Sequence, residues 1–273
     1  MFVTGVQTCA LPIWQKLFYR LLYAASFFII PAFLFIFMGL LSQYHVTIPD
    51  SIPAESMPPQ ELLPLEETTV YDTGALYVIF PGYSEVNLVC ETRPSKSDAS
   101  ITWCSGAAFQ HAVSLGFSQE NVEGDHAVKG SLYESPYNWE DFAAFTYADG
   151  HFSFAFDDPT GAIKAAADAG GSGFMQYGLI RDGEIVISFE RPRPRCYRTL
   201  AELNGNLCII DSRRMMQFDD FIGEVQQLGV SNALYMDMGA GWNYSWYRNA
   251  ADRVVTLFGL PVPWSHNWIV FQK

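Results

Sequence analysis

The chain is short of basic residues. Its 273 residues include 16 lysines and arginines against 29 aspartates and glutamates, a formal net charge of −13 at pH 7. A surface of that sign repels phosphate backbones, so the composition argues against nucleic-acid binding. The exception is the run RPRPRCYR at 191–198, which has two interpretations: an exposed turn stiffened by prolines, or a local pocket for an anion.

Cysteine is also scarce, and its spacing excludes familiar metal sites. Beyond residue 13 the chain has only Cys90, Cys104, Cys196 and Cys208, with no C-x-x-C pair. In an exported domain these four allow one or two disulfides, with three full pairings that the sequence does not rank. Buried free thiols are the equal alternative.

The signatures of several large enzyme classes are missing. The sequence contains no H-E-x-x-H, no G-x-S-x-G, no G-x-x-x-x-G-K and no dinucleotide-binding fingerprint. Zincins, α/β-hydrolases and nucleotide-fold enzymes therefore lose support. The sequence predicts no cofactor and no metal ligands, while dependence on a divalent metal is left open.

One long apolar run is present near the N-terminus. Residues 21–41 form a stretch of twenty-one positions without a charge, long enough to span a bilayer as a helix. Lys16 and Arg20 precede it, and the next positive charge is Arg93. The positive-inside tendency then predicts a cytoplasmic N-terminus and a C-terminal domain that is periplasmic or extracellular. A cleaved signal peptide is the rival, but no small-x-small site follows the run.

The chain divides by composition into four parts. Residues 3–13, VTGVQTCALPI, match the translation of a common sequencing-library adapter, so residues 1–13 are set aside from fold reasoning. We predict a transmembrane signal anchor at 14–42 and a proline- and glutamate-rich linker, too polar to pack, at 43–69. Residues 70–273 are left as one folded domain.

The folded domain is predicted to be α+β. Turn dipeptides at Asp182-Gly183 and Asn204-Gly205 indicate two hairpins. Strands outnumber helices, so we expect a mainly antiparallel sheet with a few helices, preceded by one transmembrane helix. The clearest strands are 75–80, 85–91, 232–238, 253–258 and 267–271, and the helix-like stretches are 161–170 and 216–229, the second ended by Gly229.

The most distinctive candidate site is the stretch YMDMGAGWNYSWYR at 235–248. Asp237 ends a hydrophobic strand, and the glycines that follow, Gly239 and Gly241, would let the backbone approach a ligand closely. Trp242 and Trp246 would offer flat faces on which sugars stack. The alternative is a glycine turn followed by an aromatic core cluster.

Two further clusters place polar residues among glycines. Asp125 and His126 lie side by side in NVEGDHAVKG and can point into one site from a loop; a solvated loop is the alternative. Gln176 follows the glycines of AGGSGFMQYG, whose N–H groups would suit an oxyanion or phosphate, or else form a plain flexible turn.

Taken in chain order, these clusters resemble the phosphodiester glycosidase family, specifically its exported members from gut Bacteroides-like bacteria. The matching stretches run from about residue 76 to residue 273: CSGAAFQ, NVEGDHAVKG, GGSGFMQYGLIRDGEI, YRTLAELNGNLCIIDS, FIGEVQQLGVSNALYMDMGAGWNYSWYR and NWIVF. Family members commonly carry an Asp-Gly-Gly motif where this chain has Asp237-Met238-Gly239. Because methionine departs from that motif, the substrate of the animal relative is not carried over.

The resemblance implies an exported hydrolase that cleaves the bond between a sugar's anomeric carbon and a phosphodiester oxygen, in a glycan or envelope substrate. Asp237 would stabilise or attack the positively charged sugar centre, and Arg198 would hold the phosphate by a forked contact. Asp125 or His126 would activate water or protonate the leaving oxygen, and retention or inversion stays open. The substrate-binding residues expected from the matched stretches are Gln176, Asn204, Asp211, Gly239, Trp242, Trp246 and Arg248.

A second class of function stays open, namely a non-catalytic glycan-binding or envelope-organising protein on the same fold. The methionine in the Asp-Met-Gly stretch favours it, whereas the polar residues Asp125, Arg198 and Asp237 favour the enzyme. In either case the expected partners are a carbohydrate or glycan phosphodiester and, through one N-terminal helix, the membrane.

Overall fold

The computed structural model describes residues 48–57, 66–110, 121–189, 192–238, 244–258 and 267–273. All of them belong to one compact unit, Ser42–Lys273. The predicted adapter segment and the predicted anchor, including the apolar run, lie outside the described residues. Among the residues that are described, none of the helices has both the length and the apolar character needed to cross a membrane.

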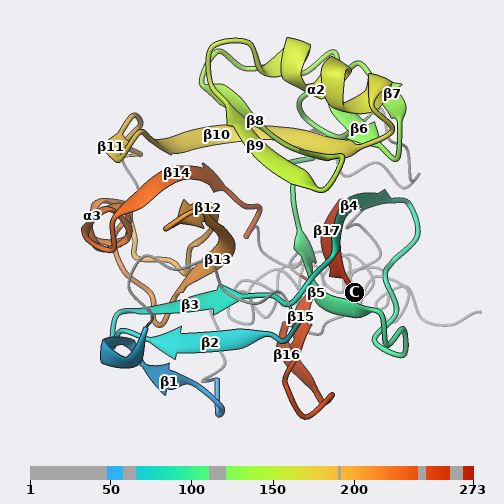
Figure 1. The fold of residues 1–273 in the computed structure, drawn as a ribbon. Helices are drawn as coiled ribbons and strands as arrows, with labels where there is room; N and C mark the ends of the chain where they lie inside the picture. The colour runs from blue at the N-terminus through green and yellow to red at the C-terminus, as the bar shows by residue number, and fades with distance from the viewer. Residues whose placement is uncertain (1–47, 58–65, 111–120, 190–191, 239–243, 259–266) are drawn as a thin grey trace, which may run out of the picture. The chain divides into compact units, whose positions relative to one another are not determined.

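The described strands form two sheets (Figure 1). The larger has twelve strands in the order β1-β2-β3-β13-β12-β14-β10-β6-β7, with β8 and β11 also paired to β10 and β9 paired to β8. Its strands are β1 (Ile52–Pro53), β2 (Thr69–Asp72), β3 (Leu76–Phe80), β6 (His126–Val128), β7 (Ser131–Tyr133), β8 (Phe142–Ala148), β9 (His151–Ala155), β10 (Ser172–Arg181), β11 (Glu184–Ile185), β12 (Arg198–Leu203), β13 (Asn206–Ser212) and β14 (Val230–Tyr235).

The smaller described sheet has five strands in the order β16-β15-β5-β17-β4. Among the described pairs only β1–β2 is parallel, so the prediction of a mainly antiparallel α+β fold is confirmed. The strands are β4 (Glu85–Cys90), β5 (Ile101–Gly106), β15 (Ser245–Arg248), β16 (Val254–Phe258) and β17 (Asn267–Gln272).

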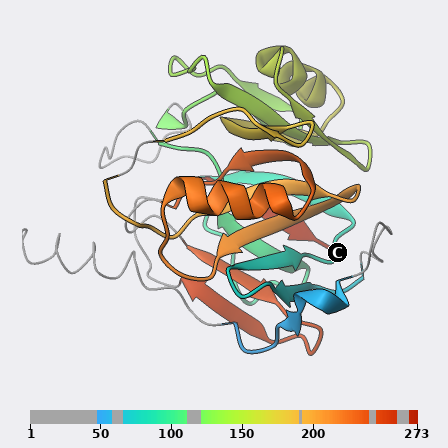
Figure 2. The same cartoon turned by 90° about the vertical axis from the view of Figure 1, so that its left-hand side faces the viewer.

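Two α-helices and one 3-10 turn occur in the described residues: α2 (Pro159–Asp168), α3 (Phe218–Gln227) and η1 (Ala54–Ser56). The side chain of Asp158 caps α2 by accepting from the N–H of Gly161. Figure 2 shows α3 lying against one face of the larger sheet. Its buried residues, Phe218, Phe221, Ile222 and Val225, recur at helical spacing and therefore form a single apolar stripe.

The larger sheet is covered on both faces where β12, β13 and β14 lie together. Leu200, Ile209 and Leu234 pack with residues of the smaller sheet, whereas Ile210 and Ala233, on the opposite face, pack with α3. All seven residues of β13 are accordingly buried. We call the face that packs toward the smaller sheet the inner face; its side chains are the ones that define the candidate site.

Part of the predicted linker is folded onto this domain. Ile52 and Pro53 pair with Tyr71 and Asp72 of β2, and Ile48 is buried in the core. The stretch 43–69 is rich in proline and glutamate, but these described residues still pair with the sheet or pack into its core. The composition-based expectation that the whole stretch would stay unpacked therefore fails for these residues.

The four cysteines beyond residue 13 are free thiols. Burial raises the pKa of Cys90 to about 12 and the pKa of Cys196 to about 11. The pKa values of Cys104 and Cys208 are raised by burial as well. Of the alternatives left by the sequence, the structure has free thiols, three of them buried and Cys90 half-buried, and the raised pKa values keep them protonated near neutral pH.

Candidate active site

Arg198 and Asp211 form an ion pair on the inner face. The two residues lie opposite each other in the β12–β13 ladder, two positions from the Leu200–Ile209 pair. Because side chains alternate along a strand, both point to the same face as Leu200 and Ile209. Arg198 Nε and Nη2 donate to Asp211 Oδ1 and Oδ2, each at 2.6 Å, and the two side chains are 2% and 1% exposed.

Trp103 of the smaller sheet covers this ion pair, and the main chain of Arg198 supports the end of β14. The guanidinium carbon of Arg198 lies 5.1 Å from the centre of the buried Trp103 ring, a cation–π arrangement. The main-chain oxygen of Arg198 accepts a hydrogen bond from Met236 N, and Asp237 N donates to Ala107 O just beyond β5. Asp237 is therefore held where strands of the two sheets meet.

Gln176 and His126 also belong to the inner face. His126 lies opposite Phe174 in the β6–β10 ladder, and Gln176 follows two positions along β10 on the same face as Phe174. Diagonal neighbours of this kind lie roughly 7 Å apart at Cα. The register therefore brings together His126 and Gln176, which the sequence places fifty residues apart.

Each of these two side chains keeps one buried polar atom without a hydrogen-bond partner among the described residues: Nε2 of His126 and Nε2 of Gln176. Gln176 Oε1 accepts from the N–H of Tyr177. His126 Nδ1 lies 3.2 Å from the carbonyl oxygen of Gly124, so Nδ1 carries the proton and Nε2 is the acceptor in the neutral ring.

The His126 ring is held in place and kept neutral. It stacks on Tyr133 of β7, with ring centres 5.1 Å apart and planes 10° from parallel. Burial lowers the pKa of His126, with the Gly124 hydrogen bond and the Asp125 charge opposing that shift. The unpartnered pair therefore consists of one acceptor, on His126, and one donor, on Gln176.

Asp125, predicted as catalytic, has both of its oxygens engaged. Oδ1 accepts from Ser135 N at 2.8 Å and from Asn138 Nδ2 at 3.1 Å, and Oδ2 accepts from Thr160 Oγ1 at 2.8 Å. The side chain is buried. These contacts give Asp125 the geometry of a loop anchor rather than of a group facing a substrate.

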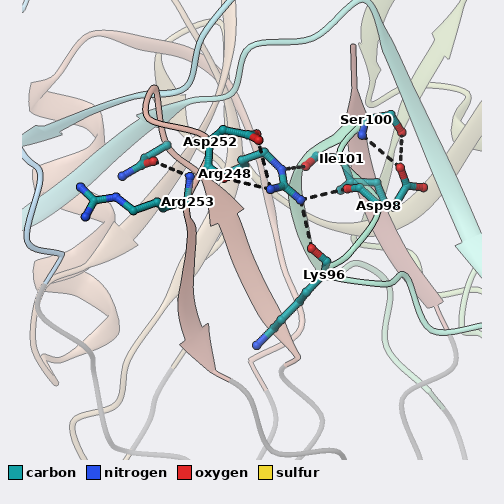
Figure 3. Close-up of polar contacts among 8 residues, drawn as sticks. Lys96, Asp98, Ser100, Ile101, Arg248, Asp252 and Arg253 are labelled. Carbon is teal, nitrogen blue, oxygen red and sulfur yellow. Dashed lines mark hydrogen bonds and ion pairs between the residues drawn. The ribbon is translucent and has the colours of Figure 1, made fainter.

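Arg248 is likewise engaged in holding the main chain (Figure 3). Its guanidinium donates to the carbonyl oxygens of Ile101, Asp252, Lys96 and Asp98, at 3.0 to 3.3 Å. Asp252 adds an ion pair at 3.4 Å. These contacts connect β15 to the chain leading into β5, and the substrate-binding role of Arg248 stays a prediction.

Two other predicted residues lie apart from this group. Asn204 occupies the left-handed position of the β12–β13 turn, at a φ of 53°, and the length of β12, about 20 Å, separates it from Arg198. Trp246 is fully buried in a cluster with Trp268 and Cys104, so no ring face is open to a sugar and the core-cluster alternative describes it. Gly239 and Trp242 lie outside the described residues.

The comparison with solved structures shows a distant likeness of fold. The catalytic domain of zebrafish N-acetylglucosamine-1-phosphodiester alpha-N-acetylglucosaminidase, auto-inhibited by its pro-peptide, is 11% identical; the match covers 82% of this chain and 87% of that one, with a TM-score of 0.52. A hypothetical protein from Synechocystis is 13% identical over 75% of this chain and 61% of its own, with a TM-score of 0.44.

Comparison at the level of sequence finds no relative. No protein-family model matches the chain, and neither does any curated protein. An identity of 11% shows a shared fold and nothing finer. The solved structures therefore support the resemblance seen in the motifs only as a distant relationship of fold with one glycosidase domain.

Sequence reasoning missed the residues that position the predicted ones. Trp103, which covers Arg198, lies one residue before the matched stretch CSGAAFQ and was not among the predicted residues, and Thr160 reaches Asp125 from the start of α2. A tryptophan in a hydrophobic strand indicates only a core position. Both contacts join segments far apart in the chain, and a single sequence does not show which distant segments will pack together.

Proposed function

We propose that this protein is a hydrolase that cleaves the bond between a sugar's anomeric carbon and a phosphodiester oxygen. The observation that carries the proposal is the unpartnered pair on the inner face, His126 Nε2 and Gln176 Nε2. A sugar hydroxyl, or a water molecule, can accept from the amide and donate to the imidazole at the same time. A buried polar atom left without a partner costs about 1–3 kcal/mol, a cost that a bound ligand would remove.

Asp237 supplies the charge that this reaction requires. When the C1–O bond breaks, the electron pair leaves with the phosphate, and positive charge develops on the sugar ring. In the proposal, the carboxylate of Asp237 either stabilises that charge or bonds to C1. A water molecule then forms the new C1–O bond, releasing the Asp237 carboxylate where it had bonded to C1, and passes one proton to the neutral His126, while Gln176 holds a hydroxyl in place.

Arg198 takes a positioning role in this scheme. Because Asp211 occupies both Nε and Nη2, the fork that would clasp a phosphate is already engaged. The pair instead holds the end of β14, through Arg198 O and Met236 N, just before Asp237. Asp125 is assigned a comparable role, anchoring the loop that follows β7.

The proposed substrate and location rest on the sequence. We propose a glycan or envelope phosphodiester as the substrate, no nucleic-acid partner, and export of the domain beyond a membrane anchor at 14–42. The acidic composition and the uncharged run at 21–41 support these parts of the proposal.

The test is turnover by the purified full chain. A panel of sugar 1-phosphodiesters is incubated with the wild type, Asp237→Asn, Gln176→Met and, as a matched control, Asp168→Asn, which changes an exposed carboxylate on α2. We expect released reducing sugar from the wild type and the control, a loss of at least about 100-fold in Asp237→Asn, and a smaller loss of about tenfold in Gln176→Met. Failure of every substrate, or full activity of Asp237→Asn, would refute the proposal.

A second function, glycan binding without catalysis, is favoured by two observations. The guanidinium expected to bind phosphate is paired with Asp211, and Met238 stands where the family motif has glycine. A binding protein would retain affinity for the panel, measured by calorimetry, without releasing sugar.

A further inference from the structure

The loop between β7 and β8, residues 134–141, is built around Asp125. Besides accepting from Ser135 and Asn138, Asp125 donates its own N–H to Asn138 Oδ1 at 3.0 Å. Ser135 Oγ donates to Val122 O at 2.7 Å. Several hydrogen bonds therefore tie this loop to the segment that precedes β6, so the loop presents its side chains from a fixed frame.

Trp139 is the large apolar side chain that this loop exposes. Its side chain is 49% exposed, and its indole N–H donates to Glu123 Oε2 at 2.9 Å. The contact satisfies the polar edge of the indole and restrains the ring. A restrained aromatic ring with part of its surface in water is the feature on which the apolar face of a sugar ring stacks.

The position of Trp139 links it to the candidate active site. Glu123 N donates to Phe109 O, and two residues earlier Ala107 O accepts from Asp237 N. The segment 107–110 therefore contacts both the residue that follows the end of β14 and Glu123, which holds Trp139. A substrate centred near Asp237 would need to extend beyond its reacting sugar to reach the indole.

The charge around Trp139 selects the kind of group that would bind there. Glu123, Glu134, Glu140 and Asp141 lie in the loop or next to it. Four carboxylates repel a phosphate at this place, whereas an uncharged sugar meets acceptors for its hydroxyls. The surroundings thus favour a neutral sugar over the phosphodiester end of a substrate.

We infer that Trp139 is a stacking platform for an uncharged sugar unit of the substrate glycan, outside the reacting centre. This inference rests on the proposed function for the identity of the ligand, but the binding it describes requires no turnover. Trp139 would then be the aromatic platform that the sequence suggested at Trp246, a residue that the structure buries in the core.

The first experiment measures binding alone. Linear neutral oligosaccharides of two to six hexose or N-acetylhexosamine units are titrated calorimetrically into the full chain carrying Asp237→Asn, and into the same chain with Trp139→Ala or Trp139→Phe. We expect Trp139→Ala to weaken the best oligosaccharide by about tenfold and Trp139→Phe, which keeps a ring, to stay within about threefold. Met215→Ala, which removes an exposed apolar side chain beside α3, is the matched control and should bind unchanged.

The second experiment separates this role from catalysis. With an active chain, Trp139→Ala should raise KM for a long glycan phosphodiester while leaving kcat, and the turnover of a monosaccharide 1-phosphodiester, unchanged.

Equal losses of oligosaccharide binding in Trp139→Ala and Trp139→Phe would reduce Trp139 to a structural link with Glu123 and overturn the inference. So would unchanged binding in Trp139→Ala, or no binding of any oligosaccharide. Oligosaccharide binding that depends on Trp139 without any turnover would uphold the platform while refuting the proposed hydrolase.

Discussion

Replacing Arg198 with methionine would leave the Asp211 carboxylate buried without its main counter-charge. The pair has bidentate geometry, with both contacts at 2.6 Å, and its side chains are 2% and 1% exposed. Removing one partner of such a buried pair costs about 3–5 kcal/mol, because the remaining charge keeps its desolvation penalty. For a folded unit of this size, roughly 2–4 °C per kcal/mol corresponds to a fall in Tm of about 10 °C.

The chain contains a matched exposed pair for comparison. Arg181 Nη1 and Nη2 donate to Asp157 Oδ1 and Oδ2, at 2.8 and 2.7 Å, but these side chains are 41% and 80% exposed. Arg181→Met should therefore cost far less stability than Arg198→Met, since water screens the exposed pair. Burial is the main difference between the two contacts, so the contrast isolates its effect.

The assay is urea unfolding of Arg198→Met, Asp211→Leu, the double variant and Arg181→Met, followed by circular dichroism. We expect the double variant to be more stable than the sum of the two single losses predicts, because it leaves no unpaired charge. Additive losses, or an Arg198→Met effect no larger than that of Arg181→Met, would refute the reasoning.

Four further predictions concern buried polar groups. Burial lowers the pKa of His126, so its ring takes up a proton more readily in the unfolded chain than in the folded one. Stability should fall as pH drops below about 6.5 and level off below the folded pKa, and His126→Phe should flatten that slope in urea titrations. Tyr247→Phe should leave the melting temperature unchanged or raise it, because the buried Tyr247 hydroxyl has no partner among the described residues. Tyr77→Phe should lower the free energy of unfolding by about 1 kcal/mol, since the Tyr77 hydroxyl accepts from Arg213. Arg248→Met should cost several kcal/mol in chemical denaturation, on the order of 3 kcal/mol, because four carbonyl oxygens lose a donor.

Local chemistry accounts for the parts of the fold that were predicted. Asp182-Gly183 and Asn204-Gly205 adopt positive φ at both positions and close the β10–β11 and β12–β13 hairpins, as such dipeptides favour. Gly229, at a φ of 84°, follows α3 where the sequence predicts the helix to end. In each case the residue and its immediate neighbours are sufficient, because the constraint is steric and local.

The candidate site was predicted only in part. The stretches around Asp125, Gln176 and Asp237 were singled out by polar residues in apolar or glycine-rich settings, and Arg198 by the basic run at 191–198 and the family resemblance. The sequence did not indicate that Asp125 anchors a loop or that Asp211 occupies the Arg198 fork. Both facts depend on which atoms meet after strands far apart in the chain have paired.

The sequence alone predicted the acidic, predominantly β character of the domain, its hairpins, its helix ends and a set of candidate polar residues. These follow from composition and from spacing within a few residues. The tertiary structure decided that Gln176 and His126 keep unpartnered atoms on one face, that Trp246 is core, and that Trp139 is exposed. Register and burial arise from contacts between distant segments, and the energy of a buried polar atom depends on those contacts rather than on its neighbours in the chain.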